Sequence, residues 1–125
     1  MEKTVLLVDD DLVLRDILQD VLESEGYNVI PASDGHQALD FLRTSGGSAD
    51  APALMILDLM MPRVNGWQVL DALQDDPSLK VPVIVLSASG SLTAAGPAPY
   101  GGLATTFLHK PFNLMELVDT VHQRC

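Results

Sequence analysis

Acidic side chains stand at two places in this chain where they could act together. Three successive aspartates, residues 9–11, end one short apolar run, and Asp58 ends another. Carboxylates that lie close together repel one another, so a cluster of this kind needs a cation. Mg²⁺ fits best because it is hard, prefers oxygen ligands and binds through one or two carboxylates together with water and phosphate. The pattern therefore predicts a magnesium site.

Two further polar side chains follow apolar runs nearer the carboxyl terminus. Lys110 follows residues 107–109 and brings a movable charge of the kind that holds phosphate, and Ser87 follows residues 81–86 and brings a hydroxyl donor. A carboxylate nucleophile, a divalent cation, a lysine and a hydroxyl together make a site for phosphoryl transfer. The set predicts that Asp58 accepts a phosphoryl group and becomes an acyl phosphate.

The chain around Asp58 predicts that this residue lies on a loop open to solvent. The unbroken apolar run at residues 54–57 is typical of a strand buried on both faces. Met61-Pro62 and Asn65-Gly66 then break the chain twice within a few residues. We therefore expect the strand to end before Asp58.

Strand-like and helix-like segments alternate along the chain and would position these residues. Strands are predicted at residues 4–8, 27–30 (closed by Pro31), 54–57, 81–86 and 107–109. Helices are predicted after the first, second, third and fifth strands. Their apolar positions are Leu14, Ile17, Leu18, Val21 and Leu22, then Ala38, Leu39 and Leu42, then Val69, Leu70 and Leu73, and finally Leu114, Leu117, Val118 and Val121.

Local signals predict where three of these helices begin or end. Asp11 is expected to cap the first helix, which Gly26 stops. Either Ser33 or Asp34 caps the second helix, and Asn113 caps the last one, where Glu116 could complete a capping box. The histidines at positions 36, 109 and 122 have no partner pattern and are interpreted as surface or packing residues.

The segment between the fourth and fifth strands departs from this alternation. Residues 87–106 are rich in Gly and Pro, which cost about 1 and about 3 kcal/mol respectively relative to Ala inside a helix. We predict that residues 89–102 form a mobile loop with at most a short helical turn at residues 91–95. The helix that the alternation calls for between these strands would then be degraded.

Composition excludes several classes of protein. The 125 residues, 47% of them hydrophobic, are enough for one domain, residues 1–125, with an aliphatic core. No apolar run reaches membrane-spanning length, and the early acidic residues are unlike a signal peptide, which favours the cytoplasm. The one cysteine, Cys125, allows no disulfide within the chain. A net charge of −10 argues against direct binding of nucleic acid and favours cations and basic partner surfaces.

Strands alternating with helices predict an α/β fold, a doubly wound parallel sheet with helices on both faces. Ligands bind such sheets at the carboxyl ends of the strands, where Asp9, Asp10, Asp58, Ser87 and Lys110 all fall. The flavodoxin-like order 2-1-3-4-5 is assumed, because the spacing alone does not determine it. In that order the first and third strands are neighbours, so their carboxylates converge.

The chain resembles the receiver domain of two-component response regulators over essentially its whole length. The resemblance rests on LLVDDD, LDLMMPRVNGW, VIVLSAS and FLHKPF in this order and spacing. It implies Mg²⁺-dependent transfer of a phosphoryl group from a phosphohistidine of a sensor histidine kinase or phosphotransfer protein. The modified domain would then bind a downstream effector protein or domain differently. Beyond its own phosphorylation and dephosphorylation, no enzyme activity is expected.

The same resemblance implies roles for individual residues. Asp58 is the phosphoacceptor, Asp9 and Asp10 form the acidic pair with Asp10 the more direct metal ligand, and Met60 lends a backbone carbonyl to Mg²⁺. The switch residues and the lysine that complete the site are Ser87, Phe107 and Lys110. Because the family's output surface includes the helix between the fourth and fifth strands, the segment rich in Gly and Pro puts the usual output in doubt.

Two alternatives use the same residues differently. A pseudo-receiver would serve only as a protein-interaction module and would never turn over phosphate. A hydrolase of the haloacid dehalogenase type also uses an aspartate nucleophile with Mg²⁺, but it expects a second aspartate two residues later, where this chain has Met60. The complete set of site residues favours the phosphoacceptor.

Overall fold

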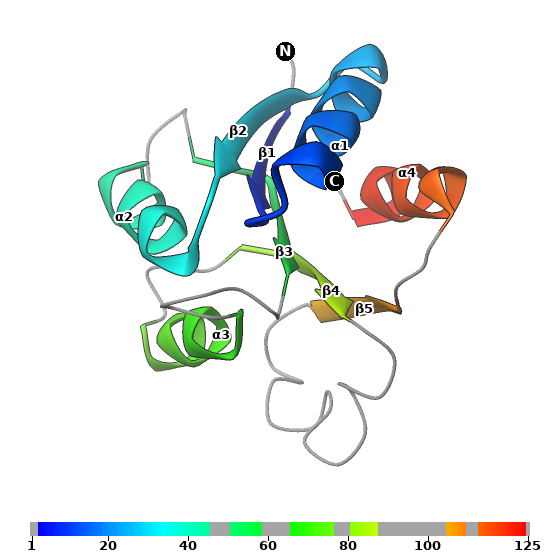
Figure 1. The fold of residues 1–125 in the computed structure, drawn as a ribbon. Helices are drawn as coiled ribbons and strands as arrows, with labels where there is room; N and C mark the ends of the chain where they lie inside the picture. Colours follow the sequence, from blue (N-terminus) through cyan, green and yellow to red (C-terminus); the bar gives the residue numbers. More distant parts are fainter. Residues whose placement is uncertain are drawn as a thin grey trace.

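A parallel sheet of five strands forms the centre of the molecule. The computed structural model describes residues 3–45, 51–58, 66–76, 81–87, 105–109 and 113–124. The strands are β1 (Thr4–Val8), β2 (Asn28–Ala32), β3 (Leu54–Asp58), β4 (Val83–Ser87) and β5 (Thr105–His109). They pair in parallel in the order β2-β1-β3-β4-β5. The predicted α/β fold and its flavodoxin-like strand order are confirmed (Figure 1).

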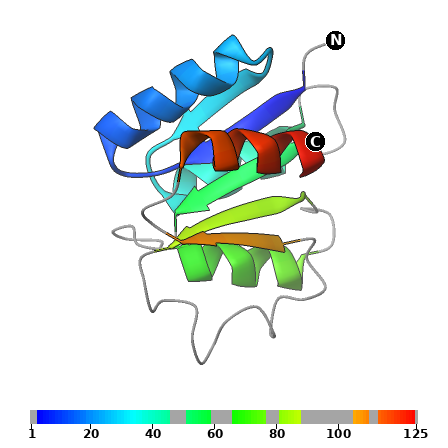
Figure 2. The ribbon, with the colours of Figure 1, turned by 90° about the vertical axis from the view of Figure 1, so that its right-hand side faces the viewer.

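The described helices cover both faces of this sheet. They are α1 (Leu12–Ser24), α2 (Gly35–Ser45), α3 (Gly66–Asp75) and α4 (Leu114–Arg124). Helices α1 and α4 lie on one face, and α2 and α3 lie on the other (Figures 1 and 2). Helix α4 follows β5, so it is the last of the helices predicted from the sequence.

The core has two halves because successive side chains of a strand point to opposite faces. Val5 and Leu7 of β1 pack with apolar residues of α1 and α4, whereas Leu6 and Val8 pack with those of α2 and α3. Every residue of β3 is buried, as expected for a central strand of a sheet that is covered on both sides. The unbroken apolar run before Asp58 therefore reflects the position of β3 within the sheet.

The second strand differs from its prediction. It continues through Pro31 and ends at Ala32, although proline was expected to close it. Strand β2 lies at the edge of the sheet and pairs only with β1. The N–H of Asn28 donates to the Lys3 carbonyl on the β1 side, and successive N–H groups of a strand alternate in direction, so position 31 faces the open side and the missing N–H of Pro31 costs the sheet no hydrogen bond.

Helix α1 begins and ends as the sequence predicts. Asp11 Oδ1 accepts hydrogen bonds from the backbone N–H groups of Val13 (3.1 Å) and Leu14 (3.2 Å), so Asp11 is the N-cap. Gly26, with φ of +96°, takes the left-handed conformation just after the helix. The next N–H, that of Tyr27, donates to the Leu22 carbonyl at 3.1 Å, which satisfies one of the last helical carbonyls.

The caps of the two other helices also follow from local chemistry. Asp34, and not Ser33, caps α2, since its Oδ1 accepts from the N–H of Gln37 at 2.9 Å. Asn113 caps α4 by accepting from the N–H of Met115 at 2.7 Å. Leu114, the first residue of α4, was predicted in the apolar stripe of this helix but is 38% exposed.

Some predictions fall where the structure gives no description. The expected loop at residues 89–102, Met60 and Lys110 lie outside the described residues. Within the residues that are described, no helix has both the length and the apolar character needed to cross a bilayer.

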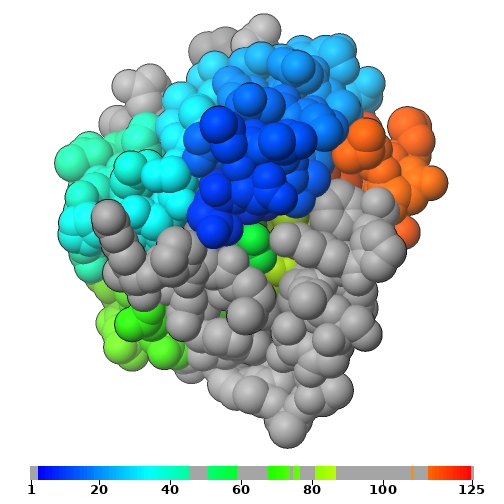
Figure 3. All heavy atoms as spheres, viewed as in Figure 1, coloured from blue at the N-terminus to red at the C-terminus, as the bar shows by residue number. Residues whose placement is uncertain are grey.

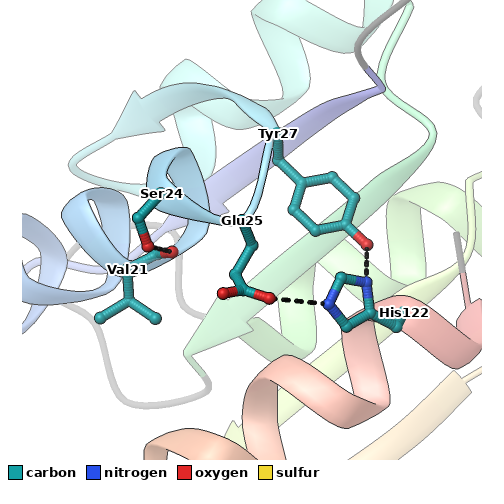
Figure 4. Close-up of polar contacts among 5 residues, drawn as sticks. All are labelled: Val21, Ser24, Glu25, Tyr27 and His122. Atoms are coloured by element: carbon teal, nitrogen blue, oxygen red, sulfur yellow. Dashed lines mark hydrogen bonds and ion pairs between the residues drawn. The ribbon is translucent and has the colours of Figure 1, made fainter.

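His122 has partners that no local sequence pattern predicts. Its Nδ1 lies 2.6 Å from the Tyr27 hydroxyl and its Nε2 lies 3.1 Å from Glu25 Oε1 (Figure 4). A neutral ring that carries its proton on Nε2 donates to Glu25 and accepts from Tyr27, so both contacts are satisfied. These partners are 95 and 97 residues away in the chain. His122 thereby joins α4 to the turn between α1 and β2.

We expect His122→Ala to lower the free energy of unfolding by about 1–2 kcal/mol, because it removes two partly exposed hydrogen bonds between separate elements. Urea denaturation followed by circular dichroism measures the loss. His36→Ala is the matched control: the His36 side chain is 69% exposed and its contact with Asp40 lies within one helix, so about 0.5 kcal/mol or less is expected. Equal losses in the two variants would contradict the role given to His122.

Candidate functional site

Three carboxylates meet at the carboxyl ends of β1 and β3. In the register of these neighbouring strands Val8 is opposite Leu57, so the next residues, Asp9 and Asp58, stand side by side. One carboxylate oxygen from each of Asp9, Asp10 and Asp58 lies within 4.8 Å of the others. The structure therefore brings together the acidic residues that the sequence separates by about fifty positions.

The three members of this acidic cluster (Asp9, Asp10 and Asp58) differ in burial. Asp9 is fully buried and Asp58 is 3% exposed, whereas Asp10 is exposed. The prediction of a solvent-open loop at Asp58 is wrong. Asp58 is the last residue of β3 and pairs in register with Leu86 of β4, so the sheet extends one residue further than the apolar run.

Hydrogen bonds hold the turn that carries two of these carboxylates. The N–H of Asp9 donates to the Ala32 carbonyl at 3.1 Å, and the N–H of Asp11 donates to Asp9 Oδ1 at 2.9 Å. Arg15 Nη1 donates to the Asp9 carbonyl at 3.1 Å. No local sequence pattern predicts this contact, because an arginine one turn into an amphipathic helix has the pattern of an ordinary surface residue.

The donor set of the acidic cluster suits a hard divalent cation. Burying a carboxylate is costly unless hydrogen bonds or an opposite charge compensate it. Three carboxylates offer only oxygen ligands, which Mg²⁺ and Ca²⁺ prefer to the nitrogen and sulfur ligands that zinc sites use. The residues therefore fit the cation that the sequence predicts. On the face that Figure 3 shows, a small area of the green segment holding β3 is visible beside the blue start of α1.

The family model of the response regulator receiver domain matches residues 5–122. The chain belongs to this family. It is a signalling domain, and the comparisons give no support to the pseudo-receiver alternative.

Relatives of this receiver domain include transcriptional regulators. It is 46% identical over 118 residues to the transcriptional regulatory protein CpxR of Escherichia coli, covering 94% of this chain and 47% of CpxR. It is 37% identical to the alkaline phosphatase synthesis transcriptional regulatory protein SphR of Synechococcus elongatus, covering 91% and 45%. The chain thus spans about half the length of these curated relatives.

Solved structures agree with the fold of this receiver domain. The receiver domain of Francisella response regulator 1452 superposes with a TM-score of 0.81 at 30% identity, covering 98% of this chain and 95% of that one. The chemotaxis protein CheY4 of Vibrio cholerae gives a TM-score of 0.80 at 25% identity, with both chains fully covered.

The remaining predicted site residues are described in part. Ser87, the last residue of β4, directly follows Leu86, the register partner of Asp58, so it stands at the same edge of the sheet as Asp58. Phe107 is the middle residue of β5. Met60 and Lys110 lie outside the described residues, so their roles in this receiver domain stay predictions.

Proposed function

We propose that this receiver domain accepts a phosphoryl group on Asp58 from the phosphohistidine of a sensor kinase or phosphotransfer protein. The observation that carries the proposal is the convergence of Asp9, Asp10 and Asp58 at the carboxyl ends of adjacent strands. The acyl phosphate would then change the affinity of the domain for a downstream effector. The family match over residues 5–122 supports a single receiver domain spanning residues 1–125.

Asp58 is the nucleophile in this proposal. One of its carboxylate oxygens attacks the phosphorus, a P–O bond forms as the P–N bond breaks, and the imidazole leaves with the electron pair of that bond. Asp9 and Asp10, with the carbonyl of Met60, would hold Mg²⁺ beside it. When bound, Mg²⁺ neutralises negative charge that develops on the phosphoryl oxygens.

Three other residues take supporting roles in the proposal. Lys110 directly follows β5 in the chain, and its ammonium would hold a phosphoryl oxygen. The hydroxyl of Ser87 would donate to another phosphoryl oxygen, and Phe107 would respond to that contact as the switch aromatic. The cytoplasmic location and the lack of direct nucleic-acid binding stay predictions.

The intact mass of the protein tests this function. After incubation with Mg²⁺ and acetyl phosphate, the chain is expected to gain one phosphoryl group, and the gain is expected to disappear when EDTA replaces Mg²⁺. An unchanged mass at saturating Mg²⁺ would remove the phosphoacceptor function and favour the pseudo-receiver.

Exposed apolar side chains on α1 and α4 support a protein as the phosphoryl donor. They are Leu12 (58% exposed), Val13 (69%) and Ile17 (44%) in the first two turns of α1, and Leu114 (38%) and Met115 (64%) at the start of α4. Both helix starts lie at the edge of the sheet where the strands end (Figure 2). Exposed apolar side chains are typical of a contact surface when they form a patch, and a partner helix docked over the starts of α1 and α4 would bring its phosphohistidine close to Asp58.

We expect Val13→Asp to slow phosphotransfer from a phosphorylated sensor kinase about tenfold or more, because a charge placed at an apolar contact weakens docking by roughly 1–3 kcal/mol. Phosphorylation by acetyl phosphate, which needs no docking, should keep its wild-type rate. Gln123→Asp adds the same charge near the far end of α4 and should change neither rate. Equal slowing with both donors would mean that Val13→Asp disturbs the site itself.

A further inference from the structure

Arg15 links helix α1 to the end of β1. It lies at the end of the first turn of α1, is half-buried, and reaches back six residues to donate from Nη1 to the Asp9 carbonyl at 3.1 Å. Asp9 itself is fully buried and is tied to β2 through its N–H and the Ala32 carbonyl. The turn between β1 and α1 is therefore held by hydrogen bonds to α1 and to β2.

These contacts fix the direction of Asp10. The carbonyl that Arg15 holds belongs to the planar peptide group joining Asp9 to Asp10, so fixing its oxygen also fixes the N–Cα bond of Asp10. The following peptide group is held by the bond from the Asp11 N–H to Asp9 Oδ1. Asp10 is exposed, and among the described residues no hydrogen bond reaches its carboxylate. The backbone of Asp10 therefore directs its side chain toward the carboxylates of Asp9 and Asp58.

Arg15 also brings a positive charge near the acidic cluster. This charge would change the Mg²⁺ affinity in the opposite direction to the hydrogen bond. A cation close to a metal site repels the metal, so removing the charge alone would strengthen Mg²⁺ binding. Removing the hydrogen bond would weaken it, because the Asp10 carboxylate would lose its direction. The direction of the change in Mg²⁺ affinity therefore distinguishes the two roles.

We propose that Arg15 is a positioning residue for the metal site, acting through the Asp9–Asp10 peptide group. The proposal rests on the proposed function, since it assumes that the acidic cluster binds Mg²⁺. Residues outside the ligand set that orient ligands commonly change metal affinity when they are replaced. Arg15 would have this effect through a backbone hydrogen bond.

Isothermal titration of the unphosphorylated protein with Mg²⁺ tests this role. Arg15→Met keeps the apolar stem but removes both the charge and the donors, and it should weaken Mg²⁺ binding about three- to tenfold, as expected for one lost hydrogen bond. Arg15→Lys keeps the charge and a donor, which is all that a single hydrogen bond to a carbonyl needs, and should stay within about twofold of wild type. Arg43→Gln removes an equal charge on α2, across the sheet, and should leave the affinity unchanged.

Three outcomes separate this inference from its alternatives. Unchanged or tighter Mg²⁺ binding by Arg15→Met would overturn it. So would a variant that unfolds at lower urea concentration while its folded form binds Mg²⁺ like wild type, because Arg15 would then be only structural. If wild type itself failed to bind Mg²⁺, the proposed function would be wrong, and the role proposed for Arg15 would be wrong as well.

Discussion

Asp58→Asn is expected to abolish phosphorylation by acetyl phosphate and by a phosphorylated kinase alike. The amide has nearly the shape of the carboxylate but is not a nucleophile, so no acyl phosphate can form. Asp58 is 3% exposed at the end of β3. The fold should persist in the variant, because a neutral amide of the same shape costs less to bury than a carboxylate. Intact mass after incubation with Mg²⁺ and the donor measures the result.

Asp20→Asn is the matched control for this loss. Asp20 is exposed on α1 and stands outside the acidic cluster, so the same change of charge there should leave phosphorylation at the wild-type level. A phosphoryl group gained by Asp58→Asn would mean that another residue is the acceptor. Loss in both variants would point to net charge and not to a nucleophile at Asp58.

Asp10→Asn is expected to weaken Mg²⁺ binding about tenfold or more, because it replaces a charged ligand by a neutral amide in a site that offers Mg²⁺ few carboxylates. Asp11→Asn should change the Mg²⁺ affinity little. The Asp11 carboxylate already accepts from the N–H groups of Val13 and Leu14, and asparagine caps helices as well as aspartate does. Isothermal titration with Mg²⁺ gives both affinities.

The comparison of these neighbours tests the assignment within the aspartate triplet. The two variants carry the same change of charge one residue apart, so a general electrostatic effect would weaken both to a similar degree. Equal losses would therefore show that Asp10 is not the ligand. The unfolding midpoints without Mg²⁺ should stay close to wild type for both.

Local chemistry predicted most of the fold. The runs at residues 4–8 and 54–57 are apolar because β1 and β3 lie in the middle of a sheet covered on both faces, and such strands are recognisable without a structure. Asp11 and Asn113 were recognised as caps because capping needs only neighbours in the chain. The strand order came from the assumed fold, and the pairing of β1 with β3 confirms it.

Contacts between distant segments account for what the sequence did not reveal. Asp58 is buried because β4 extends the pairing by one residue, which depends on a strand almost thirty positions later. Pro31 remains within β2 because that strand lies at the sheet edge. His122 meets Tyr27 and Glu25 only when α4 docks beside α1, and the Arg15 contact depends on the shape of a turn.

Chemical mapping of the phosphorylated residue tests the central claim most directly. Borohydride reduces an aspartyl phosphate to homoserine, so a phosphorylated sample that is reduced and digested carries a permanent mark at the acceptor. The phosphoacceptor function predicts homoserine at position 58, with Asp9 and Asp10 unchanged, and no homoserine when Mg²⁺ is omitted. Homoserine at position 9 or 10, or a phosphorylated chain with no homoserine at all, would contradict it.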